Sequence, residues 1–281
     1  SIPIYWKRLF FPAWCLTKHR QFLNKIGNKV MRKVVFEQAP ELNLLYRDEH
    51  LVAIDKPSGL LVHRSEIDKR ETLFAIQLTR DLIGQHVYPV HRLDRPTSGV
   101  LLFALSSAVA REMSLLLQAG KVHKTYNAIV RGYTPESLHI DYSLKEILDK
   151  KSDKFADKDK PPQNAVTDLK RLATAELPFA SGRYESSRYS LVELKPYTGR
   201  KHQLRRHMAH IRHPIIGDTN HGDGKQNKAA RENLALDRLA LVAKSLTFPH
   251  PITKEEITID ANLDTPLRQI FETCHWQNWI F

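Results

Sequence analysis

The chain has 281 residues, of which 42% are hydrophobic and 26% are charged. This composition is that of a globular protein able to bury a sizeable core, and it excludes a wholly disordered chain. Lys and Arg number 43 against 31 Asp and Glu, which gives a formal net charge of +12. We therefore expect an acidic partner, with nucleic acid ahead of a membrane surface.

The two cysteines, Cys15 and Cys274, are far apart and form no CxxC pair. A disulfide framework or a cysteine-based zinc site is therefore not expected, and the reducing cytoplasm is the favoured compartment. Neither a membrane span nor a signal peptide is indicated by the apolar runs. We treat residues 1–30 as an N-terminal extension and expect one domain over 31–281, because an ordered alternating pattern starts at Met31.

Hydrophobic periodicity and turn residues predict the elements of this domain. In chain order we expect two short strands within 42–59, a helix over 71–84, a strand at 99–105, a helix over 106–121 with Ser106 as N-cap and Gly120 as C-cap, a strand at 124–132, a surface connector at 149–162, strands at 166–174 and 188–196, a helix beginning near His202, strands at 238–251 and 255–261, and a helix over 265–276.

Strands outnumber helices in this order, and several follow one another without an intervening helix. The expected fold class is therefore α+β, with a mixed, largely antiparallel sheet and flanking helices. Neither a GxGxxG turn after a strand nor a GxxxxGK[ST] loop occurs. Dinucleotide and P-loop phosphate chemistry are therefore not supported.

The stretch HRLDRPTSG at 91–99 places Asp94 between two arginines, Arg92 and Arg95. Asp commonly caps a turn through its own side chain, so a purely structural role is one interpretation. The other is a nucleophile or general base that the arginines keep ionised. A similar choice applies to Tyr126, which could be a core residue of a strand or could stack on a nucleic-acid base.

The stretch PYTGRKHQLRRHMAH at 196–210 is dense in cations, and a helix starting near His202 would carry Arg205 one turn later. Three histidines recur at roughly helical spacing, as in some zinc sites: His207, His210 and His213. No Glu or Cys accompanies them and the arginines would repel a cation, so we expect no metal. Arginines that reach phosphates suit nucleic acid better, and a solvated helix face is the remaining alternative.

Together these stretches resemble the RluA-type pseudouridine synthases, with order and spacing that fit from about residue 42 to residue 264. The match comprises KPSG (56–59), HRLDRPTSGVLL (91–102), KTYNAIVRG (124–132), YTGRKHQLRRHMAHIRHPIIGD (197–218) and LALVAKSLTFPHP (239–251). The HRLDRPTSG variant, the lack of an S4-type RNA-binding module and the stretch ADKDKPPQNAVTDLKRLAT look like the TruC branch. That branch modifies uridine 65 in certain tRNAs.

The resemblance implies the pseudouridine synthase fold and a set of roles. Asp94 would be the catalytic aspartate that attacks the uridine, Arg205 would pair with it, and Tyr126 would stack on the flipped base. Attack on C1′, attack on C6 and a glycal intermediate are all compatible with these residues. Substrate-binding roles would fall to Arg92, Leu204, His91, Lys56, Pro57 and Arg200: Leu204 beside the base, Arg92 in the space that the uridine leaves, and Lys56 and Pro57 in the pocket wall.

The isomerisation adds and removes no atom, so we expect it to need no cofactor. The expected protein is a cytoplasmic, monomeric tRNA pseudouridine synthase that makes no membrane contact. Three alternatives stay open at this point: a ribosomal RNA uridine as the target, a non-catalytic RNA-binding protein, and a metal-dependent hydrolase that uses the histidine-rich helix.

Overall fold

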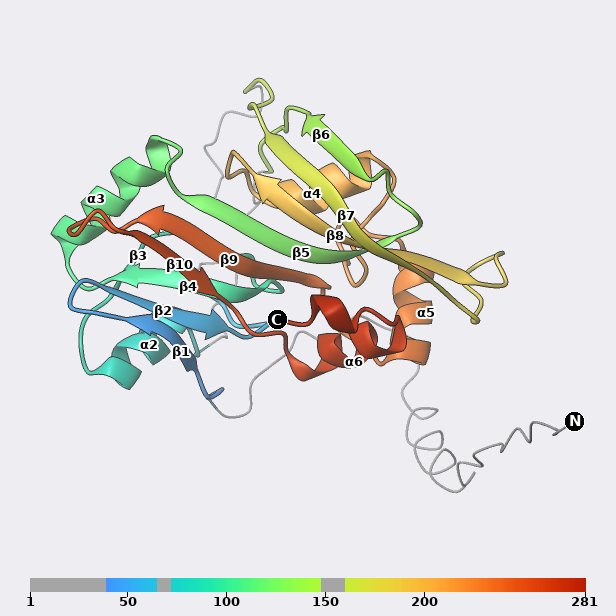
Figure 1. Ribbon diagram of the computed structural model, residues 1–281, viewed down its shortest axis with the longest axis horizontal. Coiled ribbons are helices and arrows are strands. Elements are labelled where there is room, and N and C mark those ends of the chain that lie inside the picture. Colours follow the sequence, from blue (N-terminus) through green and yellow to red (C-terminus); the bar gives the residue numbers. More distant parts are fainter. Residues whose placement is uncertain (1–38, 65–71, 148–159) are drawn as a thin grey trace, which may run out of the picture. The chain divides into compact units, whose positions relative to one another are not determined.

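The structure is a computed structural model that describes residues 39–64, 72–147 and 160–281 (Figure 1). The chain divides into one unit of residues 1–32 and another of residues 33–281, and all described residues belong to the second. The expected domain boundary after residue 30 and most of the expected connector at 149–162 lie outside the described residues.

In the described part of the chain, ten strands form a single sheet. They are β1 (Asn43–Arg47), β2 (Leu51–Lys56), β3 (Tyr88–Pro89), β4 (Ser98–Ala104), β5 (His123–Arg131), β6 (Ser137–Asp141), β7 (Val166–Leu177), β8 (Ser187–Pro196), β9 (Leu241–Pro249) and β10 (Glu256–Asp260). The helices of the described residues are α2 (Ala75–Ile83), α3 (Ser107–Gln118), α4 (Gln203–His210), α5 (Gly224–Leu234), α6 (Thr265–Thr273) and the short 3₁₀ helix η1 (Gln277–Trp279).

The strand order along the sheet is β1-β2-β4-β9-β5-β8-β7-β6, with β10 on β9 and β3 on β4 (Figure 1). β4 and β9 run parallel, whereas the other named pairs run antiparallel. The expectation of a mixed, largely antiparallel sheet is confirmed. The parallel pair is short: Ser98 aligns with Val242, and Gly99 with Ala243.

Alternate residues of β2 and β4 serve two separate cores, one on each face of this part of the sheet. On one face, a cluster that includes Ile54 and Phe103 packs with Ala75 of α2. On the other, a cluster that includes Leu102 packs with Met113 of α3. This explains why every residue of β4 is buried, as the continuous apolar pattern predicted.

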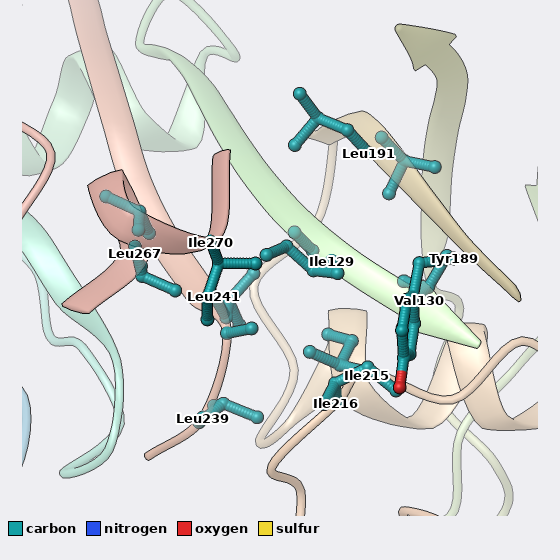
Figure 2. Close-up of a cluster of buried hydrophobic side chains, with 14 of the residues drawn as sticks. Ile129, Val130, Tyr189, Leu191, Ile215, Ile216, Leu239, Leu241, Leu267 and Ile270 are labelled. Carbon is teal, nitrogen blue, oxygen red and sulfur yellow. The ribbon is translucent and has the colours of Figure 1, made fainter. Parts of the chain in front are cut away.

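A third and larger core joins β5, β8 and β9 to helices from the second half of the chain. Leu267 and Ile270 of α6 lie close to Ile129 of β5, and Ile215 and Ile216 pack from the segment after α4 (Figure 2). Two cores therefore meet at the β4–β9–β5 junction. Tyr126 of β5 is packed against both of them.

The expected elements are confirmed with small differences. Ser106 caps α3 by accepting a hydrogen bond from the Val109 amide, but the C-cap is Ala119, and Gly120 is the left-handed residue that follows. The predicted helix over 71–84 begins only at Ala75. Among the described residues, no helix has the length and apolar character needed to cross a membrane.

Among the described residues, four elements were not predicted: β3, β6, α5 and η1. The first two are short, and α5 has the polar sequence GKQNKAARENL, which shows no apolar stripe. Its start signal was nevertheless present, because the Asp223 carboxylate accepts hydrogen bonds from the amides of Lys225 and Gln226.

Candidate active site

Asp94 lies in the turn that leads into β4. The Thr97 amide donates a hydrogen bond to the Asp94 carbonyl at 3.0 Å, which closes the turn directly before Ser98, where pairing with β9 begins. Gly99 has a φ of 109°, and a Cβ there would lie 2.2 Å from the Ala243 carbonyl oxygen. Only glycine fits this close approach of β4 to β9, so Gly99 determines the position of the Asp94 turn relative to β9.

The register of the sheet brings Tyr126 to the same place. Ala243 of β9 aligns with Gly99 of β4 on one side and with Tyr126 of β5 on the other. An irregularity in the β5–β9 register occurs between Thr125 and Tyr126. The start of β4, just after Asp94, and Tyr126 of β5 therefore lie on opposite sides of β9 at the same position along it, Ala243.

The KPSG loop is hydrogen-bonded to the turn that contains Asp94. The Gly59 amide donates to the Arg95 carbonyl at 2.8 Å, and the Arg95 Nε donates to the Gly59 carbonyl at 2.9 Å. The Ser58 hydroxyl donates to the Pro96 carbonyl at 2.7 Å. The first two motifs of the sequence are thus joined by one main-chain hydrogen bond and by two hydrogen bonds from side chains to main-chain carbonyls.

Lys56 is fully buried, and its ammonium donates to three carbonyls, those of Pro57, Leu60 and Arg95, at 2.9, 2.8 and 3.1 Å. Burial, and then the nearby positive charge of Arg238, lower the pKa of Lys56 to about 7. An ammonium with three carbonyl acceptors shapes the loop and is closed to solvent. Lys56 therefore stabilises the KPSG loop from the protein interior, next to the half-buried Pro57.

Arg205 of α4 links Asp94 to a second carboxylate. Its Nη1 donates to Oδ2 of Asp94 at 3.2 Å, while Nε and Nη2 donate to the two carboxylate oxygens of Asp218, each at 2.7 Å. The Arg205 and Asp218 side chains are 4% and 1% exposed, whereas that of Asp94 is 28% exposed. The forked contact fixes the guanidinium, which then presents its remaining edge to the accessible Asp94.

Asp218 is a fixed anion at the base of this arrangement. Burial alone would favour its neutral form, but the hydrogen bonds and charge of Arg205, with the amides of His221 and Asn220, hold the pKa of Asp218 below its ordinary value. Asp218 is thus the buried counter-ion of Arg205. The sequence interpretation did not identify this residue, although a single Asp after the apolar run IIG, close to a cationic helix, was a usable signal.

Tyr126 places an aromatic ring near Asp94. Burial, and then the negative charge of Asp94, raise the pKa of its phenol above the ordinary value, so the hydroxyl stays protonated at neutral pH. The side chain packs against the apolar residues of both neighbouring cores and is half-buried. Leu204, 6% exposed, belongs to one of these cores.

His202 and His221 lie on the α4 side of Asp94. The His202 Nε2 is 3.9 Å from Oδ2 of Asp94, and its Nδ1 is 3.0 Å from Nε2 of His221. His202 was noticed only as one cation among several, and His221 was missed.

The other residues with expected substrate-binding roles occupy three different settings. Arg92 is exposed beside Asp94. His91 accepts a hydrogen bond from the Leu102 amide at its Nε2, and burial, followed by the charge of Lys124, lowers the pKa of His91 to about 3, so its imidazole is neutral. Arg200 is exposed, and its Nε donates to the Asn164 carbonyl.

The three histidines considered for zinc have other partners. His207 bonds Thr167 Oγ1 and the Tyr142 carbonyl, His210 stacks on the Tyr142 ring, and His213 Nδ1 bonds the Arg131 carbonyl. Within residues 39–64, 72–147 and 160–281, no group of three or more His, Cys, Asp or Glu side chains could hold a metal ion.

Residues 50–210 match the family model described as RNA pseudouridylate synthase. A protein of Yersinia pestis named tRNA pseudouridine synthase C is 56% identical over 235 residues, which cover 84% of this chain and 91% of that protein. A protein of Vibrio parahaemolyticus with the same name is 55% identical over 236 residues, 84% of this chain and 96% of that protein.

Solved structures share the fold. Human RNA pseudouridylate synthase domain containing 4 superposes with a TM-score of 0.61 and 26% identity, covering 83% of this chain and 92% of that one. Human RNA pseudouridylate synthase domain containing 1 has a TM-score of 0.63 at 22% identity, covering 89% and 90% of the two chains.

Proposed function

The chain belongs to the RNA pseudouridylate synthase family, and we propose that it isomerises a uridine of tRNA, at position 65, to pseudouridine. The observation that carries this proposal is the accessible Asp94 carboxylate, held by the buried Arg205 next to the ring of Tyr126. The tRNA substrate is supported by the names of relatives that share 54–56% identity with the chain. Position 65 is supported by the likeness of the HRLDRPTSG stretch to the TruC branch.

Asp94 is the nucleophile in this proposal. A carboxylate that works beside RNA phosphates must stay ionised, and Arg205 at 3.2 Å favours the anion. Because Asp218 takes the other two guanidinium contacts, Arg205 holds Asp94 through one hydrogen bond only. The carboxylate can then leave that contact when it attacks the uridine.

Tyr126 holds the target base once it has left its stack. Extruding a base costs a few kcal/mol, and stacking on an aromatic ring offsets part of this. Leu204 supplies apolar surface in the adjoining core, and Arg92 lies exposed beside Asp94, where it can fill the space left in the RNA. His91, Arg200, Lys56 and Pro57 complete the substrate-binding set, Lys56 and Pro57 by shaping the wall.

The reaction moves bonds within one molecule. The N1–C1′ bond breaks, the base turns, and a C5–C1′ bond forms while C5 loses a proton and N1 gains one. Substrate and product are isomers, so the net reaction requires no redox partner. The net charge of +12 supplies tRNA affinity, which we expect to fall as salt rises. We place the activity in residues 31–281, acting as a cytoplasmic monomer.

The test is loss of the C5 proton. A tRNA transcript carrying uridine tritiated at C5 is incubated with the purified protein, and tritium released to water is counted. The proposal predicts release up to one equivalent per tRNA. Release from ribosomal RNA transcripts but not from tRNA would support the isomerase activity and contradict tRNA as its substrate. No release from either would favour a non-catalytic RNA-binding protein.

A further inference from the structure

The residue before α4 has an unusual backbone and an unusual role. His202 is the N-cap of α4 and has left-handed dihedral angles, with φ of 56° and ψ of 28°. A side chain at this position commonly accepts a hydrogen bond from the first helical amides, but that of His202 makes no such bond. Its imidazole instead lies between Asp94 and His221.

The pair of imidazoles fixes one tautomer of His202. The 3.0 Å contact between His202 Nδ1 and His221 Nε2 requires one ring to donate and the other to accept. If His202 donated from Nδ1, its neutral ring would point the Nε2 lone pair at the Asp94 carboxylate 3.9 Å away. The carboxylate therefore favours the opposite arrangement, in which His221 donates to Nδ1 and His202 carries its proton on Nε2.

The Nε2 proton of His202 is available to donate a hydrogen bond to a substrate. At 3.9 Å, Asp94 is too distant to accept a full hydrogen bond from it. The His202 side chain is 17% exposed, so part of the imidazole is accessible to solvent.

The surroundings keep this imidazole neutral. Burial lowers the pKa of His202, and nearby positive charges reinforce the effect against the opposing charge of Asp94. The titratable and charged groups that face the pair are Asp94, Arg205, Lys201, Arg206 and Asp218. A neutral N–H beside a reactive carboxylate is suited to donating a hydrogen bond to an oxygen that becomes negative.

We propose that His202 donates a hydrogen bond from Nε2 to a carbonyl oxygen of the uracil ring as the N1–C1′ bond breaks, and that His221 is the positioning residue that holds His202 in this tautomer. This inference rests on the proposed function. When the N1–C1′ bond breaks, its electron pair moves into the ring and onto the carbonyl oxygens. His202 keeps its proton throughout, so the step adds no proton transfer to the isomerisation.

The experiment compares matched variants at both positions by single-turnover tritium release, tRNA binding and thermal unfolding. His202→Leu removes the donor, and His202→Gln replaces it with an amide N–H. His221→Phe removes the bond to Nδ1, and His221→Gln restores a donor. His139→Leu, at an exposed histidine of β6 bonded to Asp168, is the control.

We expect His202→Leu to lower the single-turnover rate about 100-fold, the typical effect of losing one donor to a developing oxyanion, with little change in tRNA affinity. His202→Gln should recover much of this rate. His221→Phe should lower the rate less, and His221→Gln should restore it. The wild-type rate should show no dependence on His202 protonation between about pH 6 and pH 8.

Several outcomes would contradict the inference. A His202→Leu protein as fast as an active wild type would overturn it alone, whereas a wild type that releases no tritium would overturn the proposed function as well. If His202→Leu does not fold, equal rates for His221→Phe and His221→Gln would overturn it. A rate that increases as the pH falls from 8 to 6 in the wild type but not in His202→Gln would identify the imidazolium as the active form and would also overturn it.

Discussion

Asp48 and Asp94 both lie in turns beside β2 or β4, and each faces a histidine, but their carboxylates differ in how completely they are bonded. Oδ1 of Asp48 accepts hydrogen bonds from the amides of His50 and Leu51, each at 2.7 Å. Its Oδ2 accepts the Tyr46 hydroxyl and lies 3.0 Å from Nε2 of His250, which is 3% exposed.

Asp94 has far fewer partners. Within the described part of the chain its carboxylate accepts one hydrogen bond, from Arg205 at 3.2 Å, and the His202 nitrogen is 3.9 Å away. A carboxylate whose oxygens are all bonded holds a structure together, and breaking those bonds costs stability. One that retains unused acceptor capacity in a pocket can act on a substrate. The difference distinguishes a structural Asp–His pair from a reactive one.

Asp94→Asn should produce the largest change. The amide cannot act as a nucleophile, so we expect tritium release to fall by at least about 10³-fold, while tRNA affinity stays close to that of the wild type. Single-turnover rates and filter binding on the same transcript measure both. Turnover within a few-fold of wild type would remove Asp94 from the mechanism.

Arg205→Met should come next, because it leaves Asp218 buried without its cation. Removing one partner of a buried ion pair typically costs about 3–5 kcal/mol, and the site also loses the group that holds Asp94. Urea unfolding at neutral pH measures the stability change. Arg206→Met, one residue further along α4 at a half-buried position, is the control and should cost under about 1 kcal/mol.

Asp48→Asn should reduce stability without reducing activity. We expect a loss of about 1–3 kcal/mol from its hydrogen bonds. Hydrogen bonds from Tyr46 and the turn amides hold the pKa of Asp48 below its ordinary value, although burial opposes this. Its stabilisation is therefore present above the ordinary pKa and is lost as the pH falls through the lowered value. Urea unfolding at pH 7 and in acid should show the variant approaching wild type in acid; a drop in tritium release would contradict the structural assignment.

Substitutions of the two tyrosines beside these carboxylates should have the smallest effects on stability and rate. The Tyr46 hydroxyl is bonded to Asp48, whereas the Tyr126 hydroxyl makes no hydrogen bond within the described residues. Tyr46→Phe should cost about 1 kcal/mol of stability, and Tyr126→Phe should leave both stability and rate nearly unchanged because the ring is kept. Tyr126→Leu should weaken catalysis by about 1–3 kcal/mol of lost stacking. A large loss of rate in Tyr126→Phe would show that the hydroxyl takes part in the chemistry.

The sequence predicted the fold class and most elements because their signals are local: alternation in β5, the apolar run of β4 and the Ser106 cap. It also identified Asp94, Tyr126 and Arg205 as candidate catalytic residues, because they lie in motifs with a recognisable family pattern. The convergence of Asp94 and Tyr126 depends on the β4–β9–β5 register, in which Gly99, Ala243 and Tyr126 form one row.

Other parts of the site could not be predicted in this way. Asp218 and His221 lie 13 and 16 residues after Arg205, in a loop whose contacts are set only when the chain folds back on α4. Lys56 was expected in the pocket wall, but its burial among three carbonyls follows from the packing of two distant loops and could not be predicted. Residue type indicates what a side chain can do, whereas tertiary packing decides which of its atoms stay available.

The most direct test of the central claim is to map pseudouridine at nucleotide resolution in unmodified tRNA transcripts treated with the wild-type protein, with Asp94→Asn and with Asp48→Asn. The account predicts a single new pseudouridine, at position 65, made by the wild type and by Asp48→Asn but absent with Asp94→Asn. Pseudouridine made equally by all three proteins, or by none, would contradict it.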